Sequence, residues 1–277
     1  MSVEITAVQR GCVYDGDGLR TTVFLAGCTL RCPWCCNPET WSSRSSFFDE
    51  SKCLALEGME SDLCTACELA GGERPRTECP FGAATPARRS VSAEDLLEIC
   101  LKDRDMFATS GGGVTFSGGE PLMQARNLLP VLSGLKENDI DICFETTLAV
   151  PRESVETVLP YTSSLIVDLK LQPVYVGRSP GYADSLAATL RALSGRVRIK
   201  YRLVFIDAME NSVAELAARL EALGIRAVEL LQAHNLGANK YRRLGLEARD
   251  FSASPARLEA FATALAGRGI GVSVLKL

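Results

Sequence analysis

The sequence has little excess charge of either sign, no long apolar run and only one histidine among its 277 residues. Its formal net charge is −4 and its pI is near 5.3, so no basic surface for nucleic acid or anionic lipid is indicated. No apolar stretch approaches membrane-spanning length, and no charged segment followed by an apolar run opens the chain. Internal repeats are also lacking. We therefore expect a cytoplasmic protein without nucleic-acid or membrane partners.

Cysteine, by contrast, is abundant: there are 11, and most of them fall between Cys28 and Cys79. The hydrophobic share of 47% and the charged share of 23% are ordinary for a globular protein with a sizeable core. Without an export signal, a disulfide framework is not expected. Clustered cysteines in such a chain favour metal ligation. Cys100 and Cys143 lie apart in apolar runs and are expected in the core.

Beyond about residue 90, candidate helices and strands alternate, which indicates parallel βαβ units. The expected strands, with one earlier in the chain, are Thr21–Ala26, Val114–Ser117, Asp141–Phe144, Ser164–Lys170, Val197–Val204, Ala227–Gln232 and Gly271–Leu275. The expected helices are Ala93–Asp103, Leu122–Glu137, Arg152–Leu159, Ala183–Leu193, Ser212–Ala222 and Pro255–Ala266. This set falls short of the eight strands of a closed barrel. The sequence therefore predicts an α/β fold, an open partial (β/α)6-type barrel with its sites at the carboxyl ends of the strands.

The segment between residue 37 and about residue 90 has a different character, rich in Pro, Ser, Gly and charge, with few periodic apolar positions. Such a segment cannot bury much core by itself, so its cysteines suggest that a metal organises it. We expect residues 1–48 to form the amino-terminal part of the barrel, 49–88 a cysteine-rich insert, and 89–277 the remainder of the barrel.

A C-x3-C-x2-C triplet, Cys28, Cys32 and Cys35, directly follows the first expected strand. Three thiolates on one short loop can bind three irons of a [4Fe–4S] cube and leave the fourth iron without a protein ligand. An open coordination position is what catalysis needs, as in catalytic zinc sites. From the residues alone, a zinc site completed from elsewhere in the chain, or core thiols, are the alternatives. Cys36 is expected to be a neighbour rather than a ligand.

The triplet resembles the signature of the radical S-adenosylmethionine superfamily. Its flanks, Asp15–Arg20 and Trp34–Glu39, are similar to those of the glycyl-radical-enzyme activating enzymes. That family has Pro where this chain has Asp17. The resemblance implies that a reduced cluster passes one electron to the sulfonium of S-adenosylmethionine, and that a 5′-deoxyadenosyl radical then abstracts a hydrogen atom. No side chain is expected to be catalytic, because the protein's share is positioning and exclusion of solvent.

Gly118, Gly119 and Glu120 follow the strand Val114–Ser117 and resemble the Gly-Gly-Glu motif that holds the cofactor's amino group in this superfamily. The glycines would let the backbone approach a ligand closely, and the carboxylate can accept a hydrogen bond from an ammonium group. Without the cysteines, the same residues would be a strand-to-helix turn with a carboxylate at the helix start.

Two further pairs resemble cofactor positions of the family. Glu145 and Thr146 end one expected strand, where the family has a carboxylate–Thr pair. Asp168 and Lys170 lie two apart on the next strand and so face the same side. A structural ion pair is the alternative for Asp168 and Lys170, since buried charges are normally paired.

Arg202 and His234 complete the expected cofactor set. Arg202 sits where the family has an Arg that begins a proline-containing stretch, but both prolines of that stretch are lost here. His234 opens the run His234–Gly245, which resembles the family's His-x-Leu-Gly-x-x-Lys-Tyr-x-x-Leu-Gly. A lone histidine is often only a structural polar residue, whereas the resemblance implies a cofactor contact rather than a titrating base. The departures at Asp17 and Asp207–Asn211 lie in loops that could touch a partner.

The insert carries a second set of thiols, Cys53, Cys64, Cys67 and Cys79. Similar family members with a ferredoxin-like insert carry eight cysteines for two cubes, whereas this set suffices for one. A four-cysteine zinc site is the alternative, because C-x2-C with distant partners also suits tetrahedral zinc.

The resemblance therefore implies a radical S-adenosylmethionine oxidoreductase that abstracts a hydrogen from a glycine Cα of a partner glycyl radical enzyme. It also implies an electron donor such as flavodoxin or ferredoxin, and we expect a monomer. The alternative is a radical enzyme of the same scaffold that acts on a small molecule. A non-catalytic iron–sulfur electron carrier is disfavoured by the open fourth iron and by Gly118–Glu120.

Overall fold

Alternating and near-continuous apolar runs form the strands of this chain, and amphipathic runs form its helices. The computed structural model describes residues 2–41, 46–54, 56–59, 79–171 and 181–275, so the expectations for Cys64 and Cys67 lie outside the described residues. The strands are β1 (Ser2–Cys12), β2 (Arg20–Leu25), β3 (Ser46–Phe48), β4 (Ala84–Pro86), β5 (Arg89–Ser92), β6 (Gly113–Gly118), β7 (Asp141–Thr146), β8 (Ser164–Asp168), β9 (Arg198–Phe205), β10 (Ala227–Gln232) and β11 (Gly271–Leu275).

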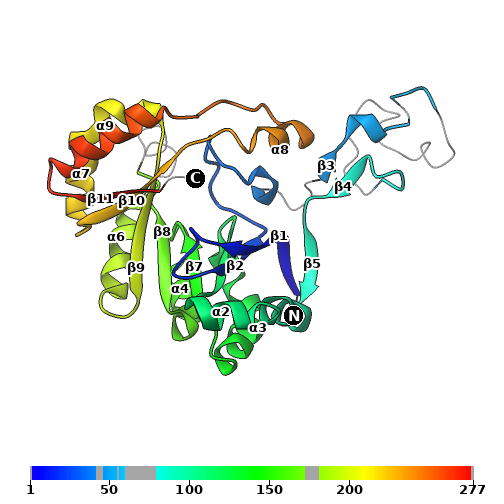
Figure 1. The fold of residues 1–277 in the computed structure, drawn as a ribbon, viewed down its shortest axis with the longest axis horizontal. Coiled ribbons are helices and arrows are strands. Elements are labelled where there is room, and N and C mark those ends of the chain that lie inside the picture. The colour runs from blue at the N-terminus through cyan, green and yellow to red at the C-terminus, as the bar shows by residue number, and fades with distance from the viewer. Residues whose placement is uncertain (1, 42–45, 55, 60–78, 172–180, 276–277) are drawn as a thin grey trace.

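The helices connect these strands and cover the outer face of the sheet, with α3 and α4 below it and α6, α7 and α9 to its left in Figure 1. They are α1 (Ala93–Leu101), α2 (Arg104–Ser110), α3 (Ala125–Glu137), α4 (Arg152–Val158), α6 (Tyr182–Leu193), α7 (Val213–Ala222), α8 (Ala238–Arg243) and α9 (Pro255–Ala266). In α3, for example, Leu128, Val131, Leu132 and Leu135 are buried at helical spacing. No helix among the described residues is long and apolar enough to cross a membrane.

One nine-stranded sheet organises the fold, in the order β11-β10-β9-β8-β7-β6-β2-β1-β5. Neighbouring strands from β2 through β6 to β11 pair in parallel. β1 pairs antiparallel with both β2 and β5. Since β11 and β5 are the two edges of the sheet, the described strands do not close on themselves. The predicted α/β fold with an open, mostly parallel sheet is confirmed.

The amino-terminal ends of the parallel strands are closed by ion pairs. Arg20, which is fully buried, donates to Asp141 Oδ1 over 2.7 Å and to Val114 O over 2.7 Å. Asp17 pairs with Lys200 over 2.6 Å and with Arg198 over 3.1 Å, at the start of β9. The departure at Asp17 therefore lies at the opposite end of the strands from their carboxyl termini and is engaged within the chain.

The described part of the insert forms a small unit of its own. β3 and β4 pair antiparallel, and Phe48, Cys53, Ala83 and Ala84 form a separate apolar cluster against which Cys79 packs. Figure 1 shows this unit projecting away from the barrel on the side of α8. Within the described residues, Cys53 and Cys79 are therefore brought together, as a shared site would require.

Candidate active site

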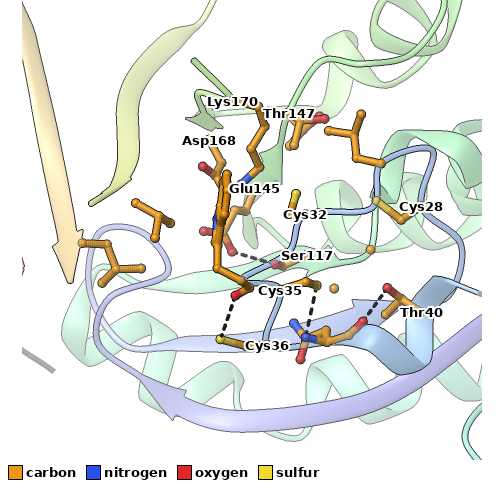
Figure 2. A pocket seen from close by; sticks show the side chains of 18 of the residues that line it. Cys28, Cys32, Cys35, Cys36, Thr40, Ser117, Glu145, Thr147, Asp168 and Lys170 are labelled. Atoms are coloured by element: carbon orange, nitrogen blue, oxygen red, sulfur yellow. Dashed lines mark hydrogen bonds and ion pairs between the residues drawn. The ribbon is translucent and has the colours of Figure 1, made fainter. Parts of the chain in front are cut away.

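A pocket of about 200 Å³ lies at the carboxyl ends of the parallel strands (Figure 2). The ends of β6, β7, β8, β9 and β10 form its walls, together with the cysteine loop that follows β2. The residues that the sequence predicted for the site and that line this pocket are Cys28, Cys32, Cys35, Gly118, Gly119, Glu145, Thr146, Asp168, Lys170 and His234. Glu120 and Arg202 were predicted for the site but do not line it.

The cysteine loop is tied together at its two ends. Gly27, with φ of +98°, begins the loop, and its N–H donates to Thr40 O over 2.9 Å. Arg31 bridges the loop, because its guanidinium donates to Cys28 O over 2.7 Å and to Trp41 O over 2.7 Å. These backbone contacts fix the loop's shape without using any thiol.

The three thiols of the triplet are not consumed by disulfide bonds. Cys28, Cys32 and Cys35 take part in no disulfide. Burial raises the pKa of Cys28 to about 11 and also raises the pKa of Cys35, so both are neutral thiols until a metal displaces the proton. Among the described residues, no three His, Cys, Asp or Glu side chains converge on a single metal-ion position. A cube takes one thiolate per iron, and the side chain of Cys36 leaves the loop in a different direction from those of Cys28 and Cys32 (Figure 2).

Gly118 and Gly119 are required by the packing of the loop. A Cβ on Gly118, whose φ is +105°, would lie 2.4 Å from Leu25 N, and a Cβ on Gly119 would lie 2.0 Å from Gly27 O. The Glu120 N–H donates to Gly27 O over 2.7 Å. The motif thus presses the end of β6 against the start of the cysteine loop, and because both glycines also line the pocket, the expectation that they let a ligand approach closely stays a prediction.

The Glu120 side chain is fully used inside the protein. It is completely buried, and its carboxylate accepts from Thr146 Oγ1 over 2.6 Å, from Thr147 N over 2.9 Å and from Thr147 Oγ1 over 2.7 Å. Leu122 N donates a further hydrogen bond over 3.3 Å. Burial raises the pKa of Glu120 despite these donors. Glu120 is not among the residues that line the pocket, and the expectation that its carboxylate accepts from an ammonium group stays a prediction.

Glu145 is held on the pocket wall from two sides. Ser117 Oγ donates to Glu145 Oε2 over 2.6 Å, and Arg202 Nη1 donates to Oε1 over 2.8 Å. Arg202 is buried, and it also reaches Tyr14 O over 2.6 Å and Glu229 over 3.2 Å. Arg202 therefore orients Glu145 without lining the pocket, and its expected direct contact with a cofactor stays a prediction.

Asp168 and Lys170 form an ion pair, the arrangement given above as the alternative to a cofactor contact, and Figure 2 shows both above the cysteine loop. Burial alone would lower the pKa of Lys170, but the charge and hydrogen bond of Asp168, together with the nearby Cys32 and Tyr182, outweigh burial and raise it. The second carboxylate oxygen, Asp168 Oδ1, is buried and has no hydrogen-bond partner within the described part of the chain. An acceptor left without a partner on a pocket wall is costly, so it fits a donor on a bound ligand.

His234 reaches the pocket from just beyond the end of β10. Its Nδ1 accepts from the Leu236 N–H over 3.3 Å, and burial lowers the pKa of the imidazole. The ring is therefore neutral at pH 7 with its proton on Nε2, where it can donate. Cys36 Sγ lies 3.8 Å from both ring nitrogens.

Sequence reasoning did not identify several residues that line the pocket, among them Thr40, Ser117, Thr147 and Gln232. Ser117 and Gln232 each end or nearly end an expected strand, and Thr147 follows the pair Glu145–Thr146 directly. Their position at strand ends was the signal that could have found them. Thr40 gave no such signal, because only the folded loop brings it beside the triplet.

In the insert, Cys79 differs electrostatically from the pocket cysteines. Burial alone would raise the pKa of its thiol, but hydrogen bonds from the backbone N–H groups of residues 81–84 outweigh burial and lower the pKa. Backbone N–H groups around a sulfur favour the thiolate, the form that ligates metals. Cys53 is buried in the same small cluster.

Known proteins resemble this chain over most of its length. A family described as a 4Fe-4S single cluster domain matches residues 14–149. The chain is 33% identical to the (2S)-3-sulfopropanediol dehydratase activating enzyme of Klebsiella oxytoca, over 86% of this chain and 84% of the relative. It is 34% identical to the pyruvate formate-lyase 2-activating enzyme of Escherichia coli, over 86% and 80%.

A third relative is the benzylsuccinate synthase activating enzyme of Thauera aromatica, 32% identical over 98% of this chain and 92% of the relative. Among solved structures, a radical SAM methyltransferase from Sphaerobacter thermophilus superimposes with a TM-score of 0.57, over 98% of this chain and 76% of the other, at 16% identity. That likeness supports the fold alone.

Proposed function

The chain belongs to the radical S-adenosylmethionine activating enzymes of glycyl radical enzymes, and from this we propose that it abstracts a hydrogen atom from a glycine Cα of a partner enzyme. The observation that supports this most is one pocket lined by three thiols of a single loop, none of them in a disulfide, and by Asp168, whose Oδ1 has no hydrogen-bond partner in the described part of the chain. In that pocket Cys28, Cys32 and Cys35 would hold a [4Fe–4S] cluster. When bound, the cluster and S-adenosylmethionine supply a one-electron reductive cleavage that yields methionine and an adenosyl radical.

The protein's own contribution is orientation of the cofactor. Asp168 Oδ1 offers an acceptor, and neutral His234 offers a donor at Nε2. Glu145, which Ser117 and Arg202 hold in place, adds a second carboxylate to the pocket wall, and a carboxylate can bind an ammonium group. Together these groups would hold S-adenosylmethionine against the cysteine loop in one pose, which is the part of catalysis that positioning supplies.

The substrate that we propose is a glycine-containing loop of a partner glycyl radical enzyme, because each of the three relatives is named as the activating enzyme of another enzyme. The hydrogen removed from the glycine Cα would pass to the 5′ carbon and leave the unpaired electron on the glycine. The electron for cleavage would come from a flavodoxin or a ferredoxin, and the chain would act as a monomer.

We further propose that the insert holds a second [4Fe–4S] cluster through Cys53, Cys64, Cys67 and Cys79, with zinc as the alternative. The approach of Cys53 to Cys79 and the thiolate-favouring backbone around Cys79 support a metal site there. Such a cluster would relay electrons or brace the surface that meets the partner.

The test mixes reduced, reconstituted enzyme with S-adenosylmethionine and a peptide that carries the glycine loop of a candidate partner. We expect an electron paramagnetic resonance doublet that collapses when the glycine is deuterated at Cα, with the deuterium recovered in 5′-deoxyadenosine. Replacing Cys28, Cys32 and Cys35 by Ala should abolish cleavage, whereas Cys12→Ala, at a cysteine outside both sets, should not. Deuterium that arrives only from a small metabolite would instead support the small-molecule alternative.

A further inference from the structure

The run His234–Gly245 does more than supply the histidine, because its middle docks on the cysteine loop. α8 packs against β3 and against the short helix η1 (Pro38–Trp41), which continues the loop (Figure 1). At Gly237 the two backbones approach so closely that a Cβ would lie 3.1 Å from Cys36 Cα. A late segment of the chain therefore covers the exit of the loop that carries the triplet.

Lys240 makes the polar contacts of this docking. Its Nζ donates to Asn37 Oδ1 over 2.8 Å and pairs with Glu39 Oε1 over 2.6 Å. Glu39 is buried, with its side chain 5% exposed, whereas that of Lys240 is 38% exposed. A buried carboxylate needs a cation or several donors, and Lys240 provides the cation.

Asn37, which accepts a hydrogen bond from Lys240, also donates one to the triplet. The Asn37 N–H donates to Cys35 Sγ over 3.3 Å. The chain of contacts thus runs from Lys240 through Asn37 to the third thiol. Hydrogen bonds to ligating sulfurs and nearby charge are two of the factors that set the reduction potential of an iron–sulfur cluster.

Tyr241, the next residue of α8, reinforces the same contact. Its ring meets Trp41 edge to face, with 5.8 Å between the centroids. Its hydroxyl is buried without a hydrogen-bond partner in the described part of the chain. Burial raises the pKa of Tyr241, and the nearby Cys35, Cys36 and Cys32 raise it further, so the hydroxyl stays a neutral donor.

We propose that Lys240 is a positioning residue for the cluster: through Asn37 and Glu39 it holds the Asn37 N–H on Cys35 Sγ and so raises the cluster's reduction potential. The inference rests on the proposed function, since it needs a cluster in this loop. Reduction adds a negative charge to the cluster, and both a directed N–H and a nearby ammonium stabilise that charge. Lys240 would thereby make the reduced cluster, and hence cofactor cleavage, accessible to a biological electron donor.

The test compares the reconstituted wild-type protein with Lys240→Met, Lys240→Arg and a matched control, Lys102→Met, which removes an exposed lysine paired with Glu98 on α1. The fraction of reduced triplet cluster is followed by electron paramagnetic resonance during a redox titration. For Lys240→Met we expect the reduced-to-oxidised ratio at fixed potential to fall about tenfold, which is about 59 mV for a one-electron couple. Lys240→Arg should recover most of this loss, and Lys102→Met should show none.

A second variant separates positioning from folding. Lys240→Met leaves Glu39 buried and unpaired, so the double variant Glu39→Gln with Lys240→Met removes that penalty while still lacking the contact to Asn37. The double variant should keep the lowered reduced-to-oxidised ratio and a near-wild-type thermal midpoint. A wild-type ratio in either cluster-loaded variant would overturn the inference and leave the proposed function standing. A wild-type protein that binds no cluster at all would overturn both.

Discussion

Single side chains around the pocket fall into two groups. Glu120 and Arg202 do not line the pocket and direct most of their charged atoms to neighbours within the protein, although Arg202 Nε has no partner in the described part of the chain. Asp168 Oδ1 has no hydrogen-bond partner in the described part of the chain, and His234 Nε2 has the thiol of Cys36 at 3.8 Å. Because buried polar groups are costly without partners, we expect this second group to carry the specific contacts with the cofactor.

His234→Gln tests this division. The variant should raise the apparent dissociation constant for S-adenosylmethionine about tenfold, which corresponds to the binding free energy of one good polar contact. Burial lowers the imidazole pKa below its ordinary value of about 6.5, so the ring stays neutral above that pH and the pH dependence of cleavage should barely change. Equilibrium binding and cleavage rates across neutral pH measure both effects.

The matched control is Leu236→Ala, which trims an exposed side chain but keeps the backbone N–H on His234 Nδ1. This control should bind S-adenosylmethionine like the wild type. A pH step that disappears in His234→Gln without any loss of binding would instead identify the histidine as a proton-transfer residue.

At this scale the sequence predicted most of the residues that gather at the pocket, but not the hydrogen-bond partners that each of them has there. Cys28, Cys32 and Cys35 share one loop, so their spacing alone brought them together. The partners of Glu120, by contrast, are Thr146 and Thr147, 26 and 27 residues away. Such contacts depend on how β6 and β7 lie side by side, which spacing along the chain does not encode.

Among the elements, the long periodic ones were predictable and the short ones were not. The parallel strands and the helices between them were found close to their true bounds, because burial on a sheet imposes continuous apolar runs. β1 and β5 were missed, since an antiparallel strand with one exposed face has a weaker pattern. α2 and α8 span only 7 and 6 residues, too few for a clear helical period.

The junction between α1 and α2 shows how β1, one of the strands that the sequence did not predict, is attached to the rest of the sheet. Asp103 lies between these helices and accepts from Arg10 Nε of β1 over 2.7 Å and from Thr21 Oγ1 of β2 over 2.5 Å. It is 8% exposed. One carboxylate therefore joins the antiparallel edge to the parallel part of the sheet.

Asp103→Asn should lower the free energy of unfolding at neutral pH by about 1–3 kcal/mol, because a buried acceptor loses charge-assisted hydrogen bonds. The hydrogen bond from Arg10 holds the pKa of Asp103 below its ordinary value. A lowered pKa means that this stabilisation is present above the ordinary carboxylate pKa and is lost as the pH falls through the native one. Urea unfolding of the wild type as a function of pH should show this loss, and the variant should show less of it.

Asp105→Asn is the control for this prediction, since the Asp105 side chain is 99% exposed and lies two residues away. It should unfold like the wild type at every pH. An acid dependence that is equal in Asp103→Asn and in the wild type would show that other carboxylates carry it.

For the whole molecule, the insert stands apart from the barrel and is organised by few apolar residues. Its described cluster contains only Phe48, Cys53, Ala83 and Ala84, with Cys79 against it. So small a core does not stabilise a domain, and bound metal is the usual substitute. The sequence predicted the need for metal here, but the direction in which the insert projects from the barrel depends on tertiary contacts that composition does not reveal.

Metal analysis of the anaerobically reconstituted protein tests the insert. We expect about eight irons per chain if both sites hold cubes, and about four irons with one zinc if the insert is a zinc module. Cys53→Ala should lower the metal content of the insert and leave cleavage of S-adenosylmethionine largely intact, because the triplet is untouched. Cleavage lost completely in Cys53→Ala, with the triplet cluster still loaded, would show that the insert takes part in the chemistry.

The contact between Asn37 and Lys240 joins residues 203 positions apart, and this has a consequence for how the protein is made. At about 5–20 residues per second, a ribosome delivers Lys240 roughly 10–40 s after Asn37. Throughout that interval the nascent triplet lacks the contact with Lys240, and the strands that form the pocket walls, β6 to β10, are added only one after another. A cluster delivered during synthesis would meet a loop that is still exposed to solvent. We therefore expect the cluster to be inserted after the chain is complete. Until then the thiols must be kept reduced.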